Sequence, residues 1–375
     1  MKYYIINRLN IAILSCLFFI LPWVMSGDLF FRQLFSEQSF DIIKTLLFIV
    51  VLLLVLLNLS LHKIRRYYIV FILLIYNLLL NWYLDLDFLR IIVNIIPFLL
   101  LTVNFNSIMF RNISKVKILA LYTNLFYLLF VFFFLIYSDK IITHDGVYSF
   151  KFIELNRHQS AYILFTLLLF FLTPNIKPTY RMLGICISVF IIYNYNVRSL
   201  IFSLFFLGVY FVHRLLVGKR FNIVIIRIFS YLGIFLFLLY LYFSFDLIIF
   251  NELTSGRILN YFQRMDLLAS LDFKSLLFGR GFGADMIIVD QWKWEAKASH
   301  SDYLTYIFDG GIISFLLISI IHYKMWFDTT LNIKYLVLAI FTSSVINVGL
   351  LLKPILLLYV FLLIPFFNSI NKKDE

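Results

Sequence analysis

Charged residues are scarce in this chain, and their scarcity excludes a soluble globular fold. Only 14% of the 375 positions are Asp, Glu, Lys or Arg, whereas 63% are hydrophobic and 45 are Phe. A soluble domain of this length covers its core with a polar shell, which this composition does not supply. Apolar runs near twenty residues recur along the chain instead, and each is long enough to cross a bilayer core of ~30 Å as a helix. The composition therefore predicts one integral membrane domain over residues 1–375.

Cysteine is also nearly absent. Cys16 and Cys186 both fall inside apolar runs, which excludes a disulfide framework and a zinc site built on thiolates. Lys2 and Arg8 precede the first apolar run, as basic residues do in a secretory signal peptide. No small-residue cleavage site follows that run and further spans do, so we expect it to be retained as the first transmembrane helix.

The apolar runs predict twelve transmembrane helices. They are about twice as long as a barrel strand, and in lipid every backbone amide and carbonyl must be bonded within the protein, so only helices fit. The expected fold class is an all-α polytopic membrane protein with about twelve transmembrane helices and a large outside loop between spans nine and ten. The expected spans are 9–27, 42–61, 67–83, 88–104, 118–137, 160–174, 182–194, 199–217, 228–250, 303–321, 334–350 and 355–369.

Basic residues predict how these spans are oriented, because Lys and Arg concentrate in cytoplasmic flanks. With the N-terminus in the cytoplasm, the inside segments hold 18 of the 32 Lys and Arg residues. The short outside segments hold eight, and the long loop 251–301 holds six. We therefore expect both termini in the cytoplasm and two sizeable outside loops, 138–159 and 251–301. The net charge of +12 is then largely a topology signal, and nucleic acid is excluded as a partner because no soluble basic face exists.

The loop 251–301 carries most of the polar side chains that could perform chemistry. Apolar residues recur at helical spacing over 258–271, which predicts an amphipathic helix with Thr254 or Ser255 as its N-cap. Arg257 and Arg264 lie seven residues apart and therefore share one face of this helix. They are either lipid-phosphate contacts of an interfacial helix or ligands of an anionic substrate.

Two further motifs lie in the same loop. Gly279, Gly281 and Gly283 alternate, and such a cluster forms either a simple turn or a cradle for phosphate. His300 stands where span ten meets the outer surface. It is either a polar side chain that reaches for water or a base that titrates beside a lipid-bound head group.

Two arginines elsewhere are assigned to the same side of the membrane. Arg157 ends the loop 138–159, and Arg198 follows span seven. Each is either a plain anchor at a helix end or part of a site. Together with Arg257, Arg264 and His300, they lie where the positive-inside rule predicts few basic residues. This convergence favours a site for an anionic substrate.

These motifs resemble those of the O-antigen ligase/polymerase superfamily, which contains Wzy-type polymerases and WaaL-type ligases. The likeness covers the arrangement of most of the chain and specific motifs from about residue 156 to 312. Four motifs match: His300 with Gly311, Ser255-Gly256-Arg257, Gly279 with Gly281, and Arg198-Ser199. Two features depart: the residue before the mid-chain arginine is Val197 where the family usually has Ser, and the Arg-x-x-x-Leu pattern of ligases fits Arg264–Leu268 better than Arg257.

The resemblance implies an O-antigen polymerase of the bacterial inner membrane, an inverting glycosyltransferase that joins repeat units carried on undecaprenyl diphosphate at the periplasmic side. His300 would accept the proton of the acceptor hydroxyl and Arg257 would hold the leaving diphosphate, with Arg198, Arg264 and Arg157 as further diphosphate ligands. The outside loops offer no clear carboxylate pair, so we expect no metal and no cofactor. Expected partners are the lipid-linked glycan donor and acceptor, membrane lipids and a chain-length regulator protein.

Two other functions stay open. An O-antigen ligase, which passes finished polymer to lipid A core, would use the same residues; the polymerase is favoured because both large outside loops carry arginines. A polysaccharide transporter or flippase would not be an enzyme, and its usual marks are ionisable residues or broken helices at mid-membrane. The expected spans are nearly free of charge, with Asp246 as the main candidate, which disfavours a transporter.

Overall fold

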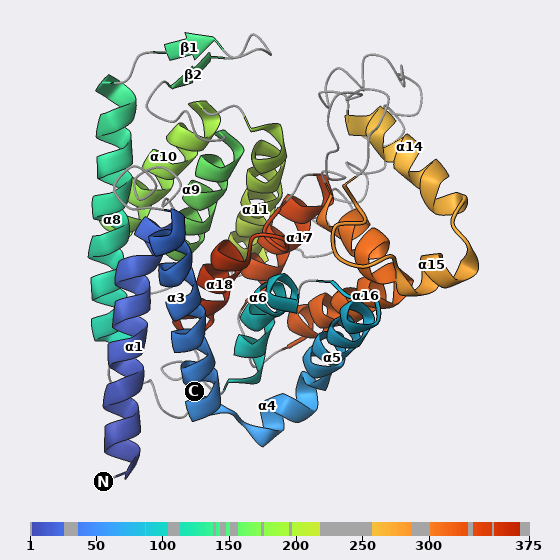
Figure 1. The fold of residues 1–375 in the computed structure, drawn as a ribbon. Coiled ribbons are helices and arrows are strands. Elements are labelled where there is room, and N and C mark those ends of the chain that lie inside the picture. The colour runs from blue at the N-terminus through green and yellow to red at the C-terminus, as the bar shows by residue number, and fades with distance from the viewer. Residues whose placement is uncertain are drawn as a thin grey trace.

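The computed structural model describes a helical chain with one short hairpin (Figure 1). The described residues are 2–25, 37–86, 88–103, 113–137, 140–142, 148–150, 157–173, 176–194, 197–217, 257–286, 301–328, 333–346 and 349–367. The first helices are α1 (Lys2–Met25), α3 (Glu37–Asn58), α4 (Leu61–Arg66), α5 (Tyr68–Tyr83), α6 (Phe88–Leu99) with the 3-10 turn η1 (Leu100–Thr102), and α8 (Ile113–Tyr137). The strands β1 (Lys140–Ile142) and β2 (Tyr148–Phe150) follow as an antiparallel pair, and the remaining helices are α9 (Arg157–Phe171), α10 (Pro178–Asn194), α11 (Arg198–Val217), α14 (Arg257–Ala269), α15 (Phe273–Phe278), α16 (Asp302–Trp326), α17 (Lys334–Ile346), α18 (Pro354–Leu362) and α19 (Ile364–Phe367).

The expected apolar spans coincide with helices wherever the structure describes them, so the helical fold class is confirmed apart from the small hairpin. The expected span 228–250 lies outside the described residues. Within the described ranges, three helices are long and apolar enough to cross a membrane, at Arg8–Met25, Ser114–Phe133 and Asp302–Trp326. Seven further apolar helices are 10–17 residues long. The count of twelve spans and the orientation of the termini stay predictions.

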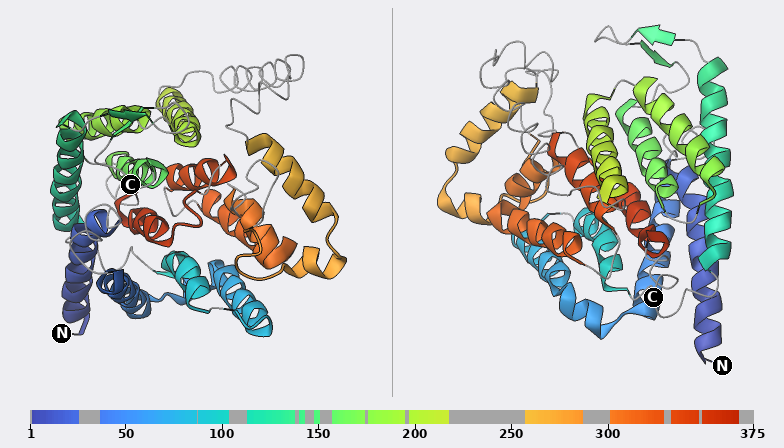
Figure 2. Two further views of the ribbon diagram at one scale, coloured as in Figure 1. Left: turned by 45° about the horizontal axis from the view of Figure 1, so that its top comes forward. Right: turned by 180° about the vertical axis from the view of Figure 1, so that it is seen from behind.

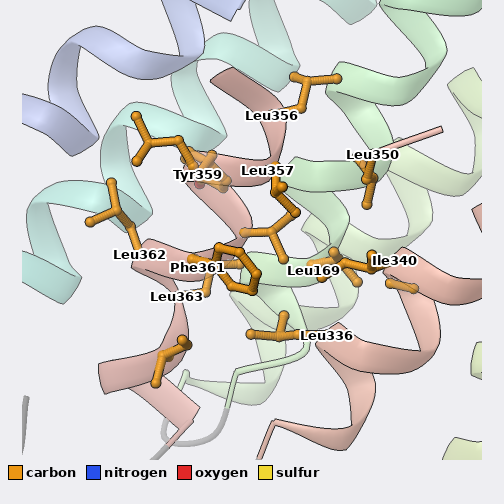
Figure 3. Packing of buried hydrophobic residues seen from close by; sticks show 14 of the residues in the cluster. Leu169, Leu336, Ile340, Leu350, Leu356, Leu357, Tyr359, Phe361, Leu362 and Leu363 are labelled. Carbon is orange, nitrogen blue, oxygen red and sulfur yellow. The ribbon is translucent and has the colours of Figure 1, made fainter. Parts of the chain in front are cut away.

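Helix α18 forms the centre of the bundle. Its residues from Leu356 to Leu362 are all buried, and it packs against α1, α6 and α9. Figure 3 shows Leu357 and Phe361 of α18 beside Leu169 of α9 and Leu336 of α17. A helix that is apolar on every side must avoid water, either in lipid or inside a bundle, and here the neighbouring helices surround it.

Helix α3 has two apolar faces, one buried in the bundle and one exposed. Its buried face includes Leu47, Phe48, Val51 and Leu54, which is the periodicity of a helix packed on one side. The opposite face exposes a second stripe of large apolar side chains: Ile42, Leu46, Ile49 and Leu53, each between 48% and 59% exposed. Water would solvate such a stripe poorly, whereas lipid chains match it, so this face is compatible with a membrane.

Helix α16 is not a continuous span. Gly311 has φ 68° and ψ −174°, a backbone conformation that ends one helix and begins another. The ring of Tyr303 lies 6.0 Å from that of His322, although a straight helix would separate these residues by about 28 Å. The two halves therefore fold back on each other at Gly311. The prediction of one uninterrupted span over 303–321 is wrong, because the sequence pattern registers the apolar length but not the sharp bend within it.

Candidate functional site

Three of the predicted site arginines each begin a helix. Arg157 is the first residue of α9, Arg198 of α11 and Arg257 of α14. In Figure 1 these three helices all begin toward the edge that bears the β1–β2 hairpin, and the N-terminus lies at the opposite edge. The side chains of these arginines, and all of His300, lie outside the described part of the structure. Helix starts carry backbone N–H groups without intrahelical partners and a partial positive charge, so the backbone adds to the field of the arginines.

The amphipathic helix predicted over 258–271 is confirmed as α14, but its polar face turns inward. Phe262 and Met265 are each 52% exposed, whereas Asn260 and Arg264 are fully buried. Phe262 and Met265 of α14 are thus directed away from the protein, whereas Asn260 and Arg264 are directed toward it, beside the buried Leu268. The interfacial alternative, in which Arg264 contacts lipid phosphates, does not fit this orientation.

Arg264 is bound into a network that joins α14 to α16. Its Nε donates to Asn260 Oδ1 at 2.7 Å, and its Nη1 donates to the carbonyl oxygen and to Oδ1 of Asp285, at 2.8 and 2.7 Å. The hydroxyl of Thr305, on the first half of α16, donates to the other carboxylate oxygen of Asp285. Burial lowers the pKa of Arg264, and the Asp285 carboxylate opposes this shift. In this arrangement the guanidinium of Arg264 binds a protein carboxylate. A diphosphate could bind the same guanidinium only by displacing that carboxylate.

The glycine cluster forms a turn whose amides are engaged by the protein. The N–H of Arg280 donates to the carbonyl of Phe308 at 3.0 Å, and that of Gly281 to the carbonyl of Asp309 at 2.8 Å. The next two amides, of Phe282 and Gly283, donate to Asn81 Oδ1 and to Asp309 Oδ1, each at 3.1 Å. Of the two alternatives left open for this cluster, a simple turn describes this conformation, because a phosphate would need those amides unengaged.

The main chain of this turn lies directly against the main chain at the break in α16. Gly279 and Gly311 both have positive φ, 82° and 68°. A β-carbon at Gly311 would overlap the carbonyl of Leu277, and a β-carbon at Gly279 would overlap the carbonyl of Asp309. The hydroxyl of Tyr76 completes the junction, since it donates to the carbonyl oxygens of Phe278 and Gly310, each at 2.9 Å. The segment after α15 and the break in α16 are therefore held together by main chain rather than by side-chain packing alone.

Polar residues of the apolar spans gather beside this junction, and the sequence reasoning missed them. A hollow of about 30 Å³ is lined by polar side chains of three helices and by apolar neighbours. The polar side chains are those of Asn77, Asn81, Asn94, Tyr306 and Asp309. The hollow is large enough for about one or two water molecules. Two features of the sequence could have indicated this hollow. Asp309 is a charged residue inside the expected span 303–321, and Asn77 and Asn81 lie one helical turn apart in an apolar run.

Asp302 and Lys353 form a second polar cluster that the sequence reasoning did not identify. The carboxylate of Asp302 is fully buried. It accepts hydrogen bonds from the backbone N–H groups of Gly349 and Leu351, at 2.7 and 2.9 Å. The ammonium of Lys353 lies 4.4 Å from the centre of the Tyr162 ring. This cluster links the start of α16 to the turn between α17 and α18, near the beginning of α9.

The described residues include no group of three or more His, Cys, Asp and Glu side chains suited to a metal ion. What they offer at the hairpin-bearing edge is three helix starts that each carry an arginine, an arrangement that can stabilise negative charge. Comparisons with protein-family models, with curated proteins and with solved structures found no match to this chain.

Proposed function

We propose that the chain is an O-antigen polymerase, a membrane glycosyltransferase that joins undecaprenyl-diphosphate-linked repeat units at the periplasmic side of the inner membrane. One observation carries the proposal: α9, α11 and α14 each begin with an arginine, and all three begin toward the same edge. A reaction that releases a diphosphate needs fixed positive charge where the leaving oxygens develop theirs. Arginine supplies it, because it stays charged and binds phosphate through two parallel hydrogen bonds.

The reaction is a single displacement at the anomeric carbon of the donor. The acceptor hydroxyl oxygen forms a bond to that carbon while the bond between the carbon and the diphosphate oxygen breaks. The electron pair leaves with the undecaprenyl diphosphate, whose charge Arg257 and its neighbours Arg198 and Arg157 stabilise. His300 accepts the proton of the hydroxyl as it attacks, a role that suits an imidazole. One displacement inverts the configuration at the anomeric carbon.

Arg264 has a different place in this proposal. Its buried pairing with Asp285 connects α14 to α16. Arg257 begins the same helix, and His300 immediately precedes Ser301, which caps α16. The Arg264–Asp285 pair therefore links the element that carries the proposed diphosphate ligand to the element next to the proposed base. We assign Arg264 a positioning role in place of direct contact with the diphosphate.

A non-enzymatic polysaccharide transporter is the second candidate, and the break in α16 favours it. Helices interrupted within the membrane, with ionisable residues nearby, are typical of transporter binding sites. Asp309 stands two residues before the break at Gly311, and Asp302 is fully buried at the start of the same helix. An O-antigen ligase remains the third candidate, because it would use the same arginines and histidine.

Deletion of the gene in its host separates the three candidates through the lipopolysaccharide that remains. Loss of a polymerase leaves lipid A core capped by a single repeat unit. Loss of a ligase leaves long polymer on its carrier lipid, and loss of a transporter leaves lipid-linked units on the cytoplasmic leaflet with no capped core. The wild-type gene on a plasmid should restore long chains, and either of the latter two phenotypes would overturn the proposal.

A further inference from the structure

A partly open cavity of about 360 Å³ lies among α1, α3, α6 and the start of α18. Its walls are apolar except for two cations, Lys44 and Lys353. The other lining residues are Val24, Met25, Phe48, Val93, Leu352, Pro354, Ile355 and Leu356. No acidic side chain is among these described lining residues. The volume is within the range of small-ligand pockets, which runs from ~300 to ~1,000 Å³.

Lys44 occupies a position where the helix pattern predicts an apolar residue. It lies three and four residues before the buried Leu47 and Phe48, and therefore on the inward face of α3. The outward face of the same helix is the exposed apolar stripe that contains Ile42 and Leu46. An ionisable residue on the inward face of a membrane-compatible helix is costly, and such residues typically mark binding sites.

Lys353 supplies the second charge that lines the cavity. It precedes α18 and packs over the Tyr162 ring at 4.4 Å. Burial lowers the pKa of Lys353 to about 8, against the attraction of Asp302. An anion in the cavity would oppose this effect of burial and favour the charged form.

The surroundings of the cavity indicate the kind of anion. The cavity lies on the inward side of α3, and the outer face of this helix presents large apolar side chains that are compatible with lipid. Its apolar lining suits a hydrocarbon chain, whereas its two ammonium groups suit a phosphate. In Figure 1 and in the right view of Figure 2, α1 ends and α3 begins partway along α8, below the edge of the bundle that bears the hairpin.

We propose that this cavity is a binding site for the phosphate of a membrane lipid, held by Lys44 and Lys353 with the adjoining part of its hydrocarbon chain against the apolar wall. The site does not include the arginines that begin α9, α11 and α14. It does not depend on the glycosyl transfer proposed above, because it requires lipid binding and no turnover.

Thermal unfolding of the purified full chain in an uncharged detergent tests the site. The probes are undecaprenyl phosphate, dioleoyl phosphatidylglycerol, dioleoyl phosphatidylcholine and inorganic phosphate, each titrated to obtain an apparent Kd. We expect undecaprenyl phosphate to raise the unfolding midpoint of the parent protein. Lys44→Glu should raise the apparent Kd for undecaprenyl phosphate by about tenfold or more, which is the effect of losing a hydrogen bond to a charged group.

The matched control is Lys274→Glu, which reverses the same charge on the exposed surface of α15 and should leave the Kd unchanged. Lys44→Met, which keeps the length of the side chain without its charge, guards against a general loss of folding and should weaken binding less than Lys44→Glu. A shift with undecaprenyl phosphate alone supports a site for phosphate monoesters; equal Lys44-dependent shifts with phosphatidylglycerol support a site for anionic lipids in general. The proposal is overturned if Lys44→Glu binds as the parent does, or if phosphatidylcholine or inorganic phosphate stabilises the protein equally.

Discussion

Gly279, which follows α15, and Gly311, inside α16, adopt the same rare backbone conformation where their segments cross. Gly279 has φ 82° and ψ −177°, and Gly311 has φ 68° and ψ −174°. This region of backbone space is essentially restricted to glycine. Both glycines belong to motifs on which the resemblance to the O-antigen ligase/polymerase superfamily rests. Their crossing gives these motifs a structural reason: two main chains approach too closely for a β-carbon.

Alanine at either glycine should destabilise the protein strongly. Each substitution adds about 1–3 kcal/mol of backbone strain, and its β-carbon overlaps a carbonyl group of the other segment. The measurement is the thermal unfolding midpoint of purified protein in detergent. Gly208→Ala is the matched control, because Gly208 lies inside α11 with open space where its β-carbon would be. The control should be neutral or up to ~1 kcal/mol more stable; a similar loss in all three variants would contradict the crossing.

The Arg264–Asp285 pair should behave as one unit in a double-mutant cycle. Breaking a buried ion pair by removing one partner costs about 3–5 kcal/mol, because the other charge stays buried without it. Arg264→Ala and Asp285→Ala should therefore each destabilise the protein, and the double variant should lose clearly less than the sum of the two. Arg280→Ala, at an exposed position, should change stability by no more than about 0.5 kcal/mol. Additive effects of the two single substitutions would show that the side chains do not interact.

Much of the fold followed from sequence, because apolar length and helical periodicity are local properties. The long described helices lie where the apolar runs predicted them and α14 lies where the loop showed helical spacing, whereas the short helices α4 and α15 were not predicted. The break at Gly311 did not follow, because glycine is tolerated inside helices and the backbone angle depends on a distant segment. Gly311 was noted for its spacing from His300, which carries no information about the bend.

The candidate site was predictable only in its outline. Arginines before spans indicated the helix starts, since basic residues and helix boundaries are both visible in the sequence. The partner of Arg264 was not predictable, because Asp285 lies 21 residues away across two turns. Lys44 lies in the expected span 42–61 and Lys353 between the last two expected spans, and only the packing of α1, α3, α6 and α18 brings them to one cavity.

Lipid binding in that cavity should weaken as the pH rises past about 8. The pKa of Lys353 is lowered to about 8, so its positive charge is present below this pH and lost above it. Among the described residues, Asp302 attracts Lys353, Tyr162 packs against it and Lys44 lines the same cavity. A phosphate monoester is already mostly a dianion at pH 7. The apparent Kd for undecaprenyl phosphate should therefore increase by up to about tenfold per pH unit between pH 8 and 9.5. Lys353→Arg should abolish this dependence, because arginine stays charged; an unchanged slope in that variant would assign the titration elsewhere.

The predicted orientation can be tested with two engineered cysteines. The charge bias places Lys274 outside and Lys219 in the cytoplasm. After Cys16 and Cys186 are replaced by Ser, single Cys variants at the two lysine positions are exposed to a membrane-impermeant thiol reagent in intact spheroplasts. We expect labelling of the Lys274→Cys variant only, with labelling of both after lysis. Labelling of Lys219→Cys but not Lys274→Cys in intact cells would invert the topology and remove the proposed site from the periplasm.

The mechanism depends most directly on His300 and Arg257. Loss of a general base costs about 10²–10⁴ in rate, so His300→Ala should abolish long polymer while the protein still reaches the membrane at normal levels. Loss of fixed charge at a leaving group costs a comparable ~10²–10³, and Arg257→Lys should not restore activity because an ammonium group cannot bind two phosphate oxygens in parallel. Substitutions of the two arginines should differ in their effect on stability. We expect Arg264→Ala to lower the unfolding midpoint and Arg257→Lys to leave it unchanged. Polymer length on gels at matched protein levels is the measurement, with Lys293→Ala as a control from the same loop. Full-length polymer from His300→Ala would show that this residue is an anchor and that another group, or no group, accepts the proton.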